Sequence, residues 1–452
     1  MRLRAGAVLA AAALAAGISY ISWNPQGREA PPSSGRSVAE ASRGGSLAQA
    51  PTRTSADEID RLIRAYEARV RTQPNVTDFT FLGRLYLEKG RLTGDVATYA
   101  RADTALRRSL EIYPEDAEAR SLLASVRYVS HDFRSALQIA GSLYAEDGSE
   151  FGALAVLGDA HLELGHYGRA ADAYSTLTEA LPSVPAVDVR ASRLAFLNGD
   201  VDGARRLARI AEKGARSTGV TGAGLAWYRS YRGHLEFETG RYRESERLYA
   251  SALDVAPGYH VALFGLGRAQ AARGDTDRAI RSYRRAIAIV PQPDYLAALG
   301  DLYTVTGRAG LARRQYETVE LIATLAKINE QVFNRQLVLF YADHDLNLRP
   351  ALRSAAAELR VRKDVFGHDA YAWTLYKNGK YVRARAAADR ALGLGTPDAR
   401  LLYHSGMISA ALGAEDRARD ELRRALALSP RFDPLQAERA EAALAILDRE
   451  AR

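Results

Sequence analysis

Residues 151–184 read FGALAVLGDAHLELGHYGRAADAYSTLTEALPSV, and this stretch decides the fold. Its first half places four residues on one face of a helix: Leu154, Leu157, Gly158 and His161. Its second half repeats that helical spacing with Ala170, Tyr174 and Leu177. Gly165 separates the two helices, and Pro182 ends the second, because proline has no N–H to donate. The stretch therefore predicts a pair of antiparallel helices joined by a tight turn.

The same spacing returns twice in clear form. The first copy consists of Leu263, Leu266, Gly267, Gln270, Gly274, Ala279, Tyr283, Ala286 and Pro291. The second consists of Leu402, Ser405, Gly406, Ser409, Gly413, Ala418, Leu422, Ala425 and Pro430. This pattern resembles the tetratricopeptide repeat family, whose units of about 34 residues are helix–turn–helix pairs. The resemblance implies an all-α solenoid, wound as a right-handed superhelix of repeats.

Each small residue in the pattern has a physical reason. Gly158 and Gly267 stand where the two helices of one unit cross closely, so a side chain there would push the helices apart. Gly165 and its equivalents can adopt a positive φ at the end of the first helix. One unit cannot bury its apolar face alone, and stacking therefore builds the core.

The repeat pattern covers most of the chain. Residues 57–432 form an array of about ten repeats, opened by a leading helix at 57–72, and residues 433–452 form a C-terminal capping helix. The expected units are 76–116, 117–150, 151–184, 185–225, 226–259, 260–292, 293–330, 331–364, 365–398 and 399–432. Three places depart from the pattern: extra residues at 91–97, a small-residue loop at 217–224, and a degenerate unit at 331–364.

The N-terminus predicts export. Residues 1–4 are MRLR, and residues 5–23 carry no charge. Nineteen residues make a helix of about 28 Å, close to the thickness of a bilayer core. Two interpretations stay open: an uncleaved signal anchor, or a signal peptide cleaved near Ala13-Leu14-Ala15. Residues 24–56 are rich in Pro, Ser and Gly, which predicts a disordered linker. We therefore expect an exported protein, anchored in the cytoplasmic membrane by residues 5–23 or released.

Composition excludes several classes of protein. The 452 residues contain no cysteine, which excludes a disulfide scaffold, a Cys-ligated zinc and a Cys nucleophile. The formal charge of +8 is mild for this length, and 56 of the 62 basic residues are arginines dispersed along the chain. Nucleic-acid binding would need that charge clustered with aromatic residues, so we expect no nucleic-acid partner.

No catalytic signature is present. His161 and His166 lie five residues apart across a glycine turn, unlike the two histidines of an HExxH helix. Asp343-His344-Asp345 falls at a turn between helices, where solvated turn chemistry is the simpler interpretation. We therefore expect no catalytic residue, no cofactor and no metal site. An unrecognised active site across residues 217–224 and 343–349 is kept as an alternative.

The resemblance implies a concave groove lined by the first helix of each unit. Carried onto this sequence, the groove positions predict a partner-binding set of Arg190, Arg193, Trp227, Tyr231, His234, Phe237, Phe264 and Arg268. Nearer the C-terminus the same rule gives Trp373, Tyr376, Tyr403 and His404. Arginine and aromatic residues are typical of binding hot spots, and the arginines would suit an acidic partner. The alternative is that Trp227 and Phe237 are buried in a locally irregular helix. The Lys/Asn carboxylate clamp of the co-chaperone branch is absent at the matching positions.

These observations predict a non-enzymatic scaffold of the cell envelope that binds a partner protein or peptide in its groove. The alternative is an accessory or assembly subunit of a secretion, polysaccharide or transport complex, which differs mainly in the partner. The sequence leaves the oligomeric state open.

Overall fold

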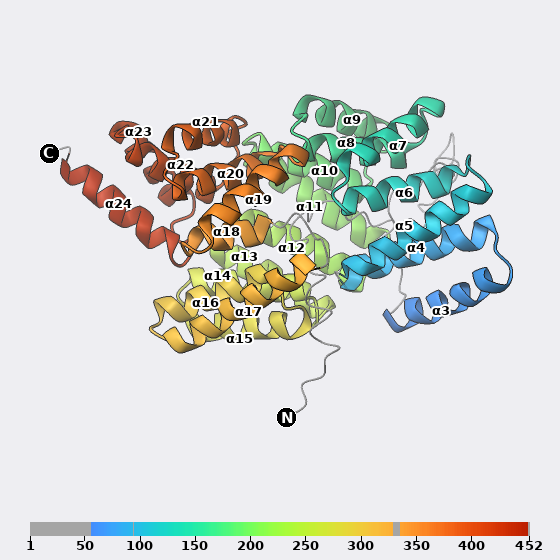
Figure 1. The fold of residues 1–452 in the computed structure, drawn as a ribbon, viewed down its shortest axis with the longest axis horizontal. Coiled ribbons are helices and arrows are strands. Elements are labelled where there is room, and N and C mark those ends of the chain that lie inside the picture. The colour runs from blue at the N-terminus through green and yellow to red at the C-terminus, as the bar shows by residue number, and fades with distance from the viewer. Residues whose placement is uncertain (1–55, 94, 329–334, 451–452) are drawn as a thin grey trace. The chain divides into compact units, whose positions relative to one another are not determined.

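The computed structural model describes residues 56–93, 95–328 and 335–450, and all the regular structure within these ranges is α-helical (Figure 1). The predicted signal segment (1–23) and all but the last residue of the predicted linker (24–56) lie outside the described residues. A leading helix, α3 (Ala56–Thr72), precedes the helix pairs, which alternate along the chain. The all-α fold class predicted from the repeat pattern is confirmed.

Each of the ten predicted units contains one helix pair. In chain order the pairs are α4 (Val76–Thr93) with α5 (Val96–Ile112), α6 (Ala117–Val129) with α7 (Phe133–Glu146), α8 (Phe151–Glu163) with α9 (Tyr167–Ala180), α10 (Pro185–Leu197) with α11 (Val201–Ser217), and α12 (Gly222–Glu238) with α13 (Tyr242–Val255). They continue as α14 (His260–Ala272) with α15 (Thr276–Ile289), α16 (Pro293–Val305) with α17 (Ala309–Ile328), α18 (Arg335–Asp343) with α19 (Leu348–Val361), α20 (Val365–Lys377) with α21 (Tyr381–Leu392), and α22 (Ala399–Ala411) with α23 (Glu415–Leu428). The last helix is α24 (Gln436–Glu450).

The pairs group into two compact units. The N-terminal unit contains the described residues up to 194 together with 206–225, and the C-terminal unit contains residues 195–205, 226–328 and 335–450. In both units the first helix of a pair contacts the first helix of the next pair, as α6 does with α8 and α20 with α22. The first helices therefore form one continuous layer in each unit, which is the arrangement that a stack of helix pairs produces.

The repeat glycines make room for an aromatic ring. A Cβ atom at Gly158 would come within 2.5 Å of the Tyr174 ring, and one at Gly267 within 2.6 Å of the Tyr283 ring. Both tyrosines are almost completely buried. The absence of a side chain at these glycines therefore allows the two helices of a pair to approach closely, as the spacing predicts. The tyrosine ring of the second helix fills the space beside each glycine.

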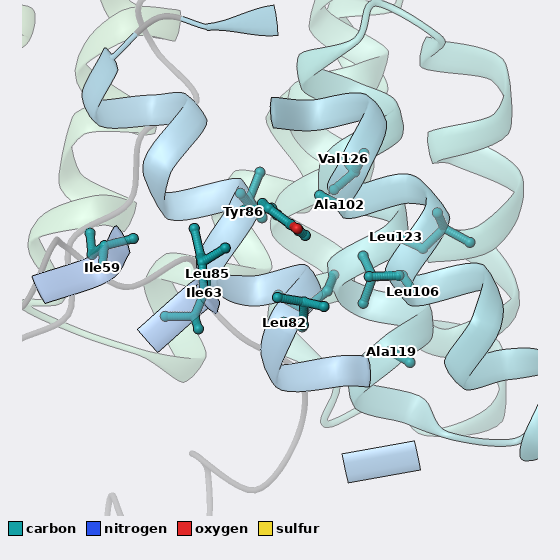
Figure 2. Close-up of a cluster of buried hydrophobic side chains, with 13 residues drawn as sticks. Ile59, Ile63, Leu82, Leu85, Tyr86, Ala102, Leu106, Ala119, Leu123 and Val126 are labelled. Carbon is teal, nitrogen blue, oxygen red and sulfur yellow. The ribbon is translucent and has the colours of Figure 1, made fainter. Parts of the chain in front are cut away.

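An apolar cluster lies at the beginning of the N-terminal unit (Figure 2). Ile59 and Ile63 of α3 pack with Leu82 and Leu85 of α4, and Leu106 of α5 lies on the far side of α4. The leading helix thus covers the open face of the first repeat. At the other end of the chain, α24 packs Ala440 and Leu447 into the cluster around α22 and α23, while Ile446 on its outer side is 48% exposed.

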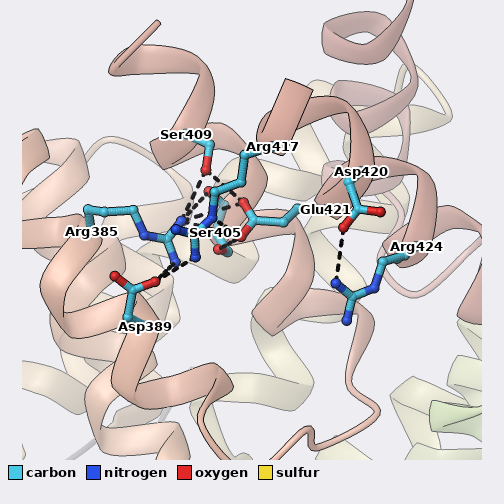
Figure 3. A network of polar contacts seen from close by, with 8 residues as sticks. All are labelled: Arg385, Asp389, Ser405, Ser409, Arg417, Asp420, Glu421 and Arg424. Atoms are coloured by element: carbon cyan, nitrogen blue, oxygen red, sulfur yellow. Dashed lines mark hydrogen bonds and ion pairs between the residues drawn. The ribbon is translucent and has the colours of Figure 1, made fainter. Parts of the chain in front are cut away.

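Polar groups also join neighbouring repeats. Figure 3 shows Glu421 of α23, which is buried and accepts hydrogen bonds from Ser405 Oγ and Ser409 Oγ of α22, both at 2.7 Å. Arg417 Nε donates to the same carboxylate at 3.0 Å, and Arg385 of α21 reaches it from the preceding repeat. Four donors therefore satisfy a carboxylate that would be costly to bury alone.

The C-terminal unit makes contacts between turns that are far apart in sequence. Tyr242 Oη lies 2.8 Å from Ser429 Oγ and accepts a hydrogen bond from the Arg431 N–H at 2.8 Å. Thr396 Oγ1 donates to the Leu197 carbonyl at 2.7 Å. These partners are 187 and 199 residues apart, which at about 34 residues a repeat is between five and six repeats. One superhelical turn therefore ends against the start of the next. We call these contacts the seam.

The irregular places differ from their predictions. The loop expected at 217–224 is shorter, because Gly222, Ala223 and Gly224 already belong to α12 and only residues 218–221 are non-helical. The extra residues near 91–97 lengthen α4 and α5. The degenerate unit has a helix pair whose first helix, α18, is short.

Candidate functional site

Two of the predicted groove residues are held in buried ion pairs of the N-terminal unit. Arg190 Nη2 lies 2.7 Å from Asp159 Oδ2, and Arg193 Nη2 lies 2.8 Å from Glu163 Oε1. All four side chains are at most 6% exposed. Both arginines project from α10 onto α8 of the preceding repeat. Their guanidinium groups are thus engaged between repeats, with little surface left for a partner.

The predicted aromatic residues of α12 are also buried. Trp227 is 5% exposed, Tyr231 7% and Phe237 2%. The rings of Trp227 and Tyr231 are nearly parallel, with centroids 5.9 Å apart. Trp227 and Phe237 therefore lie in the interior, in a helix that is continuous from Gly222 to Glu238. Trp373, Tyr403 and His404, proposed for the same face near the C-terminus, are buried as well.

The remaining predicted residues keep some exposure. His234 of α12 is 42% exposed, and its Nδ1 lies 3.4 Å from Glu238. Arg268 of α14 pairs with Glu238 at 3.2 Å and lies over the Phe237 ring, 3.9 Å from its centroid. Phe264 is partly buried against Tyr295, with ring centroids 4.2 Å apart. His234 and Arg268 are thus the predicted residues that border an accessible face.

That face continues onto residues that the prediction did not name. The charges of Asp398, Asp433, Asp343 and Glu238 act on Arg400 of α22 and raise its pKa, although burial alone would lower it. Among the described residues, Arg400 has no ion pair or side-chain hydrogen bond of its own. The Arg400 guanidinium thus lies among carboxylates without a hydrogen bond to any of them. We define the inner cluster as Glu238, Arg268, Asp294, Asp343, Asp398, Arg400 and Asp433.

Three carboxyl groups of the inner cluster hold their charge poorly. Burial raises the pKa of Asp294, Asp343 and Asp398 to about 6. The charges of Glu238 and Asp369 contribute to the raised pKa of Asp398. Five carboxyl groups face two guanidinium groups here, so an ionised cluster carries an excess of negative charge. A cationic group brought into the cluster would relieve that repulsion.

The turn of the degenerate repeat belongs to the same region, and its interpretation as solvated turn chemistry is wrong. His344 Nε2 lies 2.7 Å from Asp301 Oδ1, with both side chains 11% exposed, and its Nδ1 lies 2.8 Å from the Phe340 carbonyl. Asp343 Oδ1 accepts a hydrogen bond from Trp373 Nε1 at 2.7 Å. The bonds to Asp301 and Trp373 thus fasten α18 to α16 and α20 of the neighbouring repeats, whereas the bond to Phe340 stays within the same repeat.

A signal for part of this arrangement is present in the sequence. Glu163 and Arg193 are 30 residues apart, and so are Glu238 and Arg268. In each case the acid is the thirteenth residue of one unit and the arginine the ninth of the next. Arg400 and Asp294 occupy the second position of their units, which the groove rule includes. The sequence prediction omitted both residues, because it was based on arginines near aromatic side chains and not on groups of carboxylates.

Two further features bear on function. In the described ranges, no group of three or more His, Asp or Glu side chains is arranged to hold a metal ion. None of the helices that the structure describes is both long enough and apolar enough to cross a membrane.

Comparison with known proteins supports the repeat assignment. A sequence model of the tetratricopeptide repeat matches residues 156–218, 232–294 and 371–431. No curated protein matches the chain.

Solved structures similar to the chain include other repeat proteins. A tetratricopeptide repeat protein from Thermus thermophilus is 21% identical over 45% of this chain and 99% of its own, with a TM-score of 0.35. One from Parabacteroides merdae is 18% identical over 61% and 98%, with a TM-score of 0.33. Yeast Tom70 is 12% identical over 87% and 93%, with a TM-score of 0.34. The three matched segments, each spanning successive helix pairs with the repeat glycines in place, contain the tetratricopeptide repeat.

Proposed function

We propose that the protein is an interaction scaffold whose C-terminal unit binds a basic segment of a partner protein at the inner cluster. Tetratricopeptide repeats are typically non-catalytic scaffolds that bind proteins. The observation that carries the proposal is the crowding of Asp294, Asp343 and Asp398, whose pKa values are raised to about 6, around the unpaired Arg400.

The sign of the partner's charge follows from which charges are already neutralised. An acidic partner was expected because of Arg190, Arg193 and Arg268, but each of these pairs with Asp159, Glu163 or Glu238. The carboxylates of the inner cluster outnumber its cations, so lysine or arginine side chains complement it better. Arg400 adds selectivity, since its guanidinium can bind a backbone carbonyl or a carboxylate of the same segment.

Two labelled peptides test the sign of the charge. We expect the purified full chain to bind fluorescein-labelled octa-lysine more tightly than octa-glutamate in fluorescence anisotropy, with affinity that falls as salt is added. Glu238→Gln keeps a hydrogen-bond acceptor for Arg268 and removes one charge. It should weaken octa-lysine binding about fivefold, because a partly screened ion pair contributes about 1 kcal/mol.

The control for that variant is Asp277→Asn. Asp277 is 76% exposed and lies outside the inner cluster, so its loss should leave octa-lysine binding unchanged. Equal binding of the two peptides, or tighter binding of octa-glutamate, would contradict the proposal. So would an equal effect of the two substitutions.

We further propose that the scaffold works at the cell envelope, as a free-standing scaffold or as an assembly subunit of a secretion, polysaccharide or transport complex. The support is the charge-free segment 5–23 behind Arg2 and Arg4. A topology reporter fused after Arg452, combined with a mass measurement of the mature chain, tests export and cleavage together. Reporter activity confined to the cytoplasm would contradict export.

A further inference from the structure

The seam and the inner cluster lie at the same place in the C-terminal unit. Tyr242 begins α13 four residues after Glu238, the last residue of α12. On the other side, Thr396 precedes Asp398 and Arg400, and Ser429 precedes Asp433. The seam residues Tyr242, Thr396 and Ser429 are thus chain neighbours of cluster residues, whereas Leu197 on the first turn is not.

The cluster itself spans the seam. Glu238 is supplied by the first of the two turns, and Asp398 and Arg400 are supplied by the second, about 160 residues later. Their charges act on one another, because Arg400 contributes to the lowered pKa of Glu238 and Glu238 to the raised pKa of Asp398. Separation of the two turns would therefore divide the cluster into two halves.

The seam is held by few contacts and by two glycines. Besides the hydrogen bonds of Tyr242 and Thr396, the turns approach so closely that a Cβ atom at Gly240 would lie 2.6 Å from the Leu428 carbonyl oxygen. One at Gly199 would lie 3.1 Å from the Gly395 carbonyl oxygen. Ser429 Oγ also donates to the Phe237 carbonyl across the seam, at 3.4 Å. In the part of the chain that the structure describes, the two turns are also connected through the succession of packed repeats. Opening of the seam then requires small rotations between many repeats and no unfolding of any one of them.

We propose that the seam is a clasp that assembles the binding site. When it is closed, the two halves of the inner cluster face each other, and when it opens, the halves separate. A partner segment that contacts both halves binds the closed form more tightly, so binding and closure favour one another reciprocally. The inference rests on the proposed function for its ligand, whereas the clasp itself can be tested without one.

A matched pair of substitutions isolates the clasp. Gly240→Ala and Gly307→Ala both place alanine at φ +72°, so both incur the same local strain, but a Cβ at Gly307 meets nothing within 4 Å. A difference between the two variants therefore reports the contact with Leu428 alone. Tyr242→Phe is a milder second variant, because it removes only the hydroxyl that bridges Ser429 and Arg431.

Distances across the seam can be measured in the full chain, because the natural sequence has no cysteine. Spin labels at Arg243→Cys and Arg431→Cys, both exposed, report the seam by double electron–electron resonance. Labels at Arg243→Cys and Asp277→Cys report two successive repeats as the control pair. We expect Gly240→Ala to lengthen and broaden the seam distance by several ångströms, with no change in the control pair and none for Gly307→Ala.

Peptide binding completes the test. Gly240→Ala should weaken octa-lysine binding at least threefold, whereas Gly307→Ala should leave it unchanged, and octa-lysine should narrow the seam distances of the natural sequence. Identical seam distances in the two glycine variants would overturn the clasp. Seam opening with unchanged octa-lysine affinity would overturn its link to binding. Failure of octa-lysine to bind the natural chain would overturn the proposed function, while the spin-label distances would still decide whether the clasp exists.

Discussion

Arg190 donates two hydrogen bonds to the carboxylate of Asp159, from Nε at 2.9 Å and from Nη2 at 2.7 Å. The two side chains are only 5% and 3% exposed. Tyr174 Oη donates to the same carboxylate at 2.8 Å. One buried acid therefore joins both helices of its own repeat to the first helix of the next. In a solenoid such contacts between neighbours carry the stability, because there is no single central core.

Breaking this pair should destabilise the N-terminal unit strongly. Arg190→Ala leaves Asp159 charged and buried, which typically costs about 3–5 kcal/mol. The measurement is the urea concentration at the midpoint of unfolding, with hydrogen exchange of the α8–α10 amides as the readout. Arg209→Ala, at an exposed arginine of α11 in the same unit, is the control and should change stability by less than about 0.5 kcal/mol. Comparable losses for the two variants would contradict the structural role of Arg190.

The repeat glycine offers a second prediction. Gly158→Ala would push a methyl group to 2.5 Å from the Tyr174 ring, and such overpacking costs about 1–3 kcal/mol. Gly168→Ala, in α9 with nothing within 4 Å of the added carbon, should instead stabilise by about 0.5–1 kcal/mol, because alanine is the better helix former. Thermal unfolding of the two variants should shift in opposite directions. A stabilising Gly158→Ala would show that the helix crossing is looser than described.

Asp343 of the inner cluster predicts that the C-terminal unit becomes less stable as the pH rises. The pKa of Asp343 rises from 3.8 to about 6 on folding, chiefly through burial, so folding favours its protonated form. The stability linked to that proton is present below pH 3.8 and is lost as pH rises through 6. Asp343→Asn should therefore raise the unfolding midpoint at pH 7.5 relative to the natural sequence, and the gain should shrink at pH 5. A gain of the same size at both pH values would exclude titration as its cause.

His344 supplies a separate pH-dependent contact. Burial lowers its pKa, but the hydrogen bond and charge of Asp301 raise it by more, so the net pKa lies above 6.5. The stabilisation from this group is complete below pH 6.5 and disappears as pH rises through the raised value. His344→Gln should destabilise the α16–α18 contact at pH 6 and have a smaller effect at pH 8.5. Hydrogen exchange in α16 and α18 measures it, and equal destabilisation at both pH values would mean that the imidazole acts without its charge.

The elements of the fold could be predicted from the sequence because the repeat is a local signal. Gly158, Tyr174 and Pro182 each constrain a position within one unit, and 34 residues contain the whole pattern. The candidate site could not be predicted in the same way. Whether Arg193 faces solvent or Glu163 depends on the neighbouring repeat, and the groove rule describes one repeat at a time. The contact between Leu197 and Thr396 depends on the sum of small rotations over several repeats, which no single residue encodes.

The seam makes the number of repeats between α12 and α23 a fixed quantity. An open solenoid can gain or lose a unit during evolution and keep both ends intact, because each unit meets only its neighbours. Here, deletion of one 34-residue unit between Gly240 and Leu428 would bring a different turn opposite Gly240 and leave Tyr242 without Ser429. The seam therefore constrains the number of repeats in this turn. Duplication or loss of a repeat within it would be selected against even where every remaining unit folds well.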